Sequence, residues 1–104
     1  MTDQQIQHAI LEGAYNVMKQ KGSIEGAIFV LFEKTKDWGV EEKDINRNVD
    51  QLAKKRLIKK EGVKLVGSSV SPVIRITDEG ADRYKREHEC GDYGKYGRLA
   101  DENR

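Results

Sequence analysis

The residues best suited to binding chemistry lie in one predicted helix, spanning about residues 42–56. Its apolar stripe is Ile45, Val49 and Leu52, and at about 100° per residue the opposite face follows from helix geometry. That face carries Lys43, Arg47, Asp50, Gln51 and Lys54, with Asn46 and Asn48 on the flanks. Arg can bind guanine through two hydrogen bonds, Asn or Gln can bind adenine, and an α-helix fits the major groove. The pattern therefore predicts contact with duplex DNA, and an ordinary solvated helix face is the alternative.

Positive charge is concentrated at the end of this helix. The whole chain has a formal net charge of only +1, yet residues 41–60 hold seven Lys or Arg residues against four acids. We expect Lys55, Lys59 and Lys60 to contact DNA phosphates. Two features favour a different interpretation, because cations also suit a helix C-terminus and the Asp50 carboxylate repels phosphates.

A β-hairpin is predicted after the helix. Residues 58–66 and 73–77 are rich in apolar and β-branched side chains, and residues 67–72 have the composition of a loop. We expect Lys64 and Arg75 on the strands, and Ser68, Ser69 and Ser71 at the tip, to contact phosphates or the minor groove. A flexible solvent loop is the alternative for the tip.

Three further helices complete the predicted order. The first runs from a capping box at Thr2 to Gly22, and the second begins at Ser23 and ends near Asp37. A buried strand over 27–32 competes with the second helix, because that stretch is apolar throughout. The last helix begins at Thr77 and reaches about residue 89, after which residues 90–104 are Gly-rich and predicted to be a flexible tail. One domain over residues 1–89 follows.

Two stretches of the chain resemble winged helix-turn-helix proteins. The stretch Ile45-x3-Val49-x2-Leu52-x4-Leu57-Ile58 is similar to a recognition helix that runs into the first wing strand. Likewise Ile74-x-Ile76-Thr77-Asp78-Glu79-Gly80-x3-Tyr84 is similar to the second wing strand and the following helix. Residues 23–86 thereby resemble small regulators of the MarR and PadR types and short winged-helix proteins of archaea and mobile elements. The resemblance implies an α+β fold with three helices, a two-stranded β wing and a C-terminal helix.

Other classes of function have little support in the sequence. No Ser/His/Asp set, phosphate-binding glycine loop or pair of carboxylates stands out, so we expect no enzyme and no cofactor. His88, Cys90 and Asp92 lack a second nearby Cys or His, so we expect no metal site. The single cysteine, the absence of an apolar run of about 18–20 residues and the absence of a basic leader predict a cytoplasmic protein that does not contact the membrane.

These observations predict a sequence-specific protein that binds double-stranded DNA, a transcriptional regulator. The helix at 42–56 would enter the major groove and the hairpin over 58–77 would touch the backbone. We expect a homodimer, because one small module makes few phosphate contacts, with Tyr15 or Tyr84 at the interface. The alternative is a winged-helix module for protein–protein interaction that does not bind DNA. The sequence indicates neither an effector nor an operator.

Overall fold

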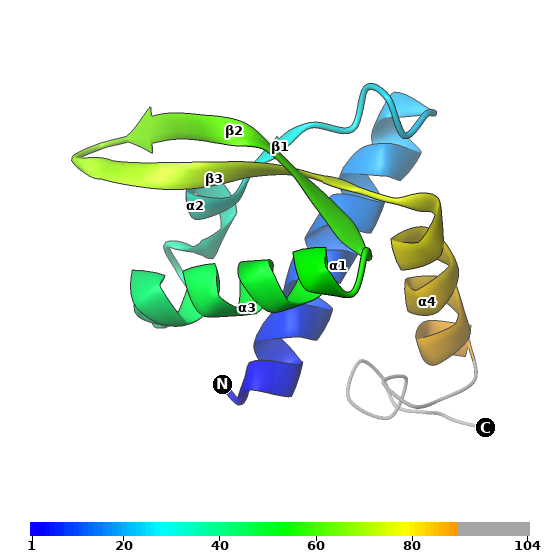
Figure 1. The fold of residues 1–104 in the computed structure, drawn as a ribbon, viewed down its shortest axis with the longest axis horizontal. Helices are drawn as coiled ribbons and strands as arrows, with labels where there is room; N and C mark the ends of the chain where they lie inside the picture. The colour runs from blue at the N-terminus through cyan, green and yellow to red at the C-terminus, as the bar shows by residue number, and fades with distance from the viewer. Residues whose placement is uncertain (90–104) are drawn as a thin grey trace.

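The computed structural model describes residues 1–89, which form an α+β fold of four helices and a three-stranded antiparallel sheet (Figure 1). The elements are α1 (Asp3–Lys21), β1 (Phe29–Val30), α2 (Leu31–Thr35), α3 (Glu42–Lys54), β2 (Ile58–Val66), β3 (Ser69–Ile76) and α4 (Asp78–Glu89). The sheet has the order β1-β3-β2, so β3 is its central strand. The predicted tail over 90–104 lies outside the described residues.

Helix α1 confirms the prediction for the first segment. The Thr2 hydroxyl accepts a hydrogen bond from the Gln5 backbone, and the Gln5 side chain accepts one from the Thr2 backbone, which completes the capping box. The helix ends at Gly22, whose φ of 78° is accessible to glycine at little cost. Ile6 and Ile10 belong to the buried face of the helix.

The predicted helix from Ser23 is wrong over most of its length. Phe29 and Val30 form strand β1, paired with Ile74 and Val73 of β3, and the helix that follows is only α2, Leu31–Thr35. The sheet therefore has three strands where two were predicted. The physical reason is tertiary, because the free edge of β3 offers backbone hydrogen bonds to a β-branched and aromatic segment. Pairing there outweighs the helical spacing of the apolar side chains.

The predictions for α3 and β2 are confirmed, but the predicted loop over 67–72 is wrong. Strand β3 begins at Ser69, so the hairpin turn consists of Gly67 and Ser68 alone, and Gly67 has a φ of 61°. The segment after the turn is held in the sheet because the Ser71 hydroxyl is buried and accepts a hydrogen bond of 2.9 Å from the Phe32 backbone. A β-bulge interrupts the β2–β3 pairing between Lys60 and Gly62.

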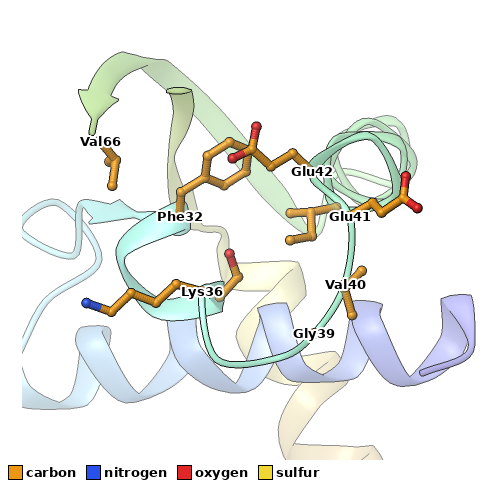
Figure 2. Close-up of a pocket in the computed structure, with 9 residues that line it drawn as sticks. Phe32, Lys36, Gly39, Val40, Glu41, Glu42 and Val66 are labelled. Carbon is orange, nitrogen blue, oxygen red and sulfur yellow. The ribbon is translucent and has the colours of Figure 1, made fainter. Parts of the chain in front are cut away.

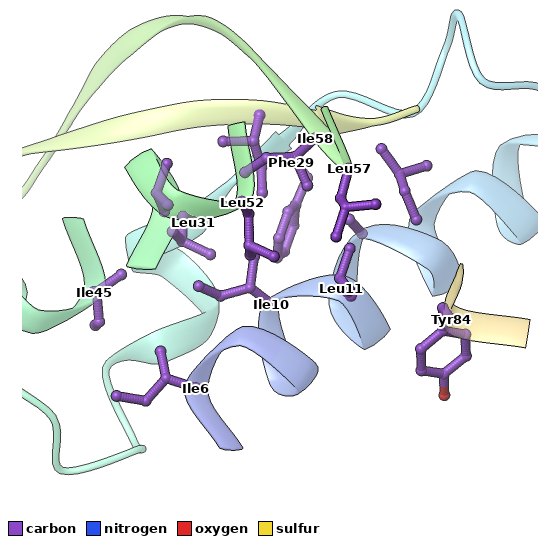
Figure 3. Packing of buried hydrophobic residues seen from close by; sticks show 14 of the residues in the cluster. Ile6, Ile10, Leu11, Phe29, Leu31, Ile45, Leu52, Leu57, Ile58 and Tyr84 are labelled. Atoms are coloured by element: carbon purple, nitrogen blue, oxygen red, sulfur yellow. The ribbon is translucent and has the colours of Figure 1, made fainter. Parts of the chain in front are cut away.

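The buried apolar residues form one cluster between the helices and the sheet (Figure 3). Ile10 of α1, Leu52 of α3 and Ile74 of β3 are among its most buried members. Helix α1 contacts both α3 and α4, while the hairpin tip and α4 lie at opposite ends of the molecule (Figure 1). The core therefore fixes α3 against α1 and leaves the far side of α3 exposed.

The start of α4 packs tightly on the connection between α3 and β2. The Thr77 hydroxyl donates to the Arg56 carbonyl at 2.7 Å and accepts from the Gly80 backbone at 2.9 Å. A Cβ atom at Gly80 would overlap the Leu57 carbonyl oxygen. Glycine is therefore required here by the close approach of two backbones, which gives a physical reason for its place in the Thr-x-x-Gly motif.

Candidate nucleic-acid interface

The exposed side of α3 carries most of the side chains that the sequence singled out there. The exposed residues are Lys43, Asn46, Arg47, Gln51, Lys54 and Lys55. They share this surface with Asp50, which is also exposed. The helix therefore presents one continuous polar face, as its spacing of apolar residues predicted.

Asn48 is the exception, because its predicted position on the flank is wrong. Its side chain is fully buried, and its amide nitrogen donates to the Asp44 carbonyl at 2.8 Å and to the Asp3 carboxylate at 3.2 Å. Its amide oxygen accepts from Gln7 at 2.8 Å. Position 48 lies three residues after Ile45 and four before Leu52, which is the spacing of a core face. Asn48 is thus a structural connection between α1 and α3.

Arg47 is exposed, but its side chain already forms two ion pairs. Its guanidinium donates to the Asp3 carboxylate at 2.7 Å and to the Asp44 carboxylate at 2.8 Å. The hydrogen bond from Arg47 holds the pKa of Asp3 below its usual value, and the same bond raises the pKa of Arg47. The unbound protein therefore keeps this predicted base-contacting group folded against α1.

Two residues of α1 that sequence reasoning missed organise the edge of this face. Asp3 binds Arg47, while Gln7 donates to Gln51 at 2.8 Å and accepts from Lys55 at 3.3 Å. Asp3 and Gln7 are four residues apart, so they lie on the same side of α1. The sequence could have indicated that Asp3 and Gln7 share one side of α1. It could not have indicated that this side faces Arg47 and Gln51, because that depends on how α1 packs on α3.

The cations of α3 and of the β2–β3 hairpin fall into two groups, those held in ion pairs and those that form none. Lys60 is paired with Asp50 at 2.8 Å, Arg75 with Glu61 at 2.7 Å, and Lys43 with Glu41 at 3.5 Å. Over residues 54–66, the exposed cations that form no ion pair within the described chain are Lys54, Lys55, Arg56, Lys59 and Lys64. Of these, Lys55 donates a hydrogen bond to the Gln7 amide oxygen.

Arg56 was not among the predicted site residues, although it lies within the basic run. Its φ of 63° marks the point where the chain leaves α3 and turns into β2. A non-glycine residue in this conformation is uncommon, and here the backbone is held by the Thr77 hydroxyl at the Arg56 carbonyl. The side chain is left exposed at the junction.

The hairpin tip offers fewer hydroxyl groups than predicted. Ser68 is exposed and Ser69 is partly buried. Ser71, also expected at the tip, is fully buried against α2, so that prediction is wrong. Lys64 remains the exposed cation nearest the tip along β2.

A hollow of about 470 Å³ lies between the hairpin, α2 and the beginning of α3 (Figure 2). Phe32, Val40, Ile45 and Val66 supply apolar walls, and Glu41 and Glu42 lie at its edge. Among the described residues, no group of three or more His, Cys, Asp or Glu residues could hold a metal ion.

Tyr84 does not form the exposed surface predicted for a dimer. It is 5% exposed, its ring lies 4.8 Å from that of Tyr15 and 5.4 Å from that of His8, and its hydroxyl donates to Glu12 at 3.1 Å. Burial, with the negative charge of Glu12, raises the pKa of Tyr84. These contacts join α4 to α1 within one chain.

Comparison with protein-family models, with curated proteins and with solved structures found no match. No helix of the described residues is both long enough and apolar enough to cross a membrane.

Proposed function

We propose that this chain is a winged helix-turn-helix protein that binds duplex DNA as a transcriptional regulator. The order of elements supports the assignment, since α1, β1, α2 and α3 precede a hairpin that leaves the end of α3 directly. In this arrangement α3 enters the major groove and the β2–β3 hairpin lies along the flanking backbone.

The observation that carries the proposal is the set of exposed cations between the end of α3 and the hairpin turn that form no ion pair within the described residues. Lys54 and Arg56 are at the end of α3, and Lys59 and Lys64 follow on β2. Cations without an internal partner can neutralise phosphates and release counterions, which provides affinity independent of sequence. Only a few such contacts are available on one chain, so a homodimer in the cytoplasm is part of the proposal.

Base recognition is assigned to Arg47 and Gln51, which must first exchange their contacts with α1. The Arg47–Asp3 pair is exposed on both sides, and exposed ion pairs are weakened by solvent and salt. A guanine edge offers Arg47 two acceptors in place of the two carboxylates. The existing contacts therefore hold the side chain near the surface of α3 without preventing exchange.

Selection from a randomised duplex pool at two salt concentrations tests the proposal. Lys59→Ala should weaken binding to all sequences and reduce the salt slope by about one. Arg47→Ala should weaken binding to the selected site roughly ten- to hundredfold and relax the preference at one base pair. Lys85→Ala is the matched control, because Lys85 is an exposed cation on α4, away from α3. If no sequence is enriched and all three variants bind like the wild type, the proposal fails.

The acidic beginning of α3 favours a second candidate, a module for protein–protein interaction. Glu41, Glu42 and Asp44 surround this helix end, where a major-groove helix would approach phosphates. A protein partner with cationic side chains would suit that end better. If the wild-type protein binds no DNA in the selection experiment, this second candidate is favoured.

A further inference from the structure

We propose that the outer edge of β2 accepts an extended strand from a partner protein whose side chains alternate between apolar and acidic. The proposal concerns protein recognition and does not depend on DNA binding. It rests on the exposure of β2, on the composition of its two faces, and on the repulsion between Lys64 side chains that arises when β2 pairs with β2 of a second copy.

The outer edge of strand β2 is exposed along most of its length. Strand β2 is an edge strand in the order β1-β3-β2, and the seven residues from Lys59 to Leu65 are all exposed. An edge strand of this length presents unpaired backbone N–H and C=O groups to solvent, which can pair with an added strand. The bulge at Lys60/Gly62 disturbs only the beginning of this edge and leaves Val63–Val66 regular.

One face of the hairpin beyond the bulge is apolar and uncovered within the described chain. Val63 is 71% exposed, Leu65 is 68% exposed and Val70 is 55% exposed. Leu65 is paired with Val70 and Val63 with Pro72, so these side chains project from the same face. Apolar side chains gathered in this way indicate an interaction surface more strongly than scattered ones do.

The other face of β2 is cationic. Lys59 is paired with Arg75 and Lys64 with Ser71, which places both lysines on the face opposite the apolar one. The carboxylate of Glu61 is held by Arg75 at 2.7 Å, and neither lysine forms an ion pair among residues 1–87. Beyond the bulge, a partner strand would therefore meet Val63 and Leu65 on one face and the positive charge of Lys64 on the other.

A second copy of the chain is a poor occupant of this edge. Two antiparallel β2 strands related by a twofold axis bring both apolar side chains onto apolar partners only when the axis passes through Lys64, with Val63 opposite the partner's Leu65. An axis through Val63 places Leu65 opposite Glu61, and an axis through Leu65 places Val63 opposite Gly67. The register with the axis through Lys64 joins the apolar faces but places Lys64 opposite the partner's Lys64, and directly opposed like charges are destabilising. A strand with an acid at this position keeps the apolar contacts and replaces the repulsion with an ion pair.

The test uses a charge swap between full-length chains. The Lys64→Glu chain presents the required partner strand, with an acid between Val63 and Leu65. Sedimentation equilibrium at up to millimolar protein, without nucleic acid, should give each chain alone, wild type or Lys64→Glu, the same mass as its Leu65→Ser counterpart. Any homodimer that forms without nucleic acid then does not use the outer edge of β2. An equal mixture of the two chains should form a heterodimer through β2 roughly two- to thirtyfold tighter than the self-association of either chain through β2.

A second substitution locates the interface. The Leu65→Ser change in the Lys64→Glu chain should abolish the heterodimer without unfolding, because Leu65 is exposed. Backbone NMR shifts on mixing should map to residues 61–66. A mixture that sediments as the sum of its components would overturn the proposal. Self-association of the wild type that Leu65→Ser abolishes would also overturn it, because a second copy would then be the occupant.

Discussion

The substitution Gly80→Ala tests the packing on which the junction of α3 with β2 depends. In an ordinary helix the change from Gly to Ala stabilises by up to about 1 kcal/mol. Here the added methyl group would overlap the Leu57 carbonyl oxygen and would lie 3.0 Å from the Ile76 side chain. The backbone carbonyl cannot rotate away as a flexible side chain would, so α4 or the junction must move.

The expected cost follows from what that movement disrupts. Overpacking costs about 1–3 kcal/mol. Displacement of α4 also stretches the hydrogen bonds from Thr77 to Arg56 and to Leu57, each contributing about 0.5–1.5 kcal/mol. After subtracting the gain in helix propensity, we expect a loss of about 1–5 kcal/mol. For a domain of this size, a loss of 2 kcal/mol lowers Tm by roughly 10–15 °C.

Thermal and urea unfolding followed by circular dichroism measure the effect. Gly26→Ala is the matched control, because a Cβ atom there meets nothing closer than 3.5 Å, and its stability should change by less than about 0.5 kcal/mol. If Gly80→Ala is as stable as the wild type, α4 does not approach Leu57 as described, and the physical account of the Thr-x-x-Gly motif is refuted.

Three further substitutions test individual contacts. Asn48→Ala should lose about 1–3 kcal/mol in urea unfolding, because it removes three hydrogen bonds of a fully buried side chain, to Gln7, to Asp3 and to the Asp44 carbonyl; a neutral change would contradict its burial. Ser71→Ala should cost a similar amount, since the buried Phe32 N–H loses its acceptor, and unchanged stability would show that the hairpin is not anchored there. Tyr84 has its pKa raised, so the stability it contributes is complete below its ordinary value of 10.0 and declines at higher pH. That decline is at most about 1.4 kcal/mol per pH unit before solvent screening is allowed for. Tyr84→Phe should make the alkaline decline shallower, and an unchanged slope would argue against its burial.

The elements that could be predicted from sequence are those with strong local signals. Helix α1 has a capping box and a terminal glycine, and α3 has a narrow apolar stripe with acids at its beginning and cations at its end. Strand β2 follows directly and has the predicted bounds. In each case neighbouring residues specify the conformation.

The errors arose where distant parts of the chain decide the conformation. Strand β1 forms because Phe29 and Val30 meet β3, and Ser71 belongs to a strand because Phe32 supplies its hydrogen-bond donor. The candidate site shows the same division. The helical period predicted the exposure of Arg47 and Gln51, but their contacts with α1 required the tertiary structure.

The anchoring of the hairpin to α2 also has a consequence for the order of folding. The Ser71–Phe32 contact joins positions 39 residues apart, whereas β2 and β3 are connected by a two-residue turn. Closing a long loop costs more entropy, and non-local strand pairs form late. We therefore expect α3 and the hairpin to assemble before the segment Phe29–Thr35 docks. The same short segment should open first in the native state, so hydrogen exchange at Phe32 should be faster than in α3. Because Phe32 forms one wall of the hollow beneath Val66, such opening would enlarge that hollow while α3 and the hairpin keep their geometry.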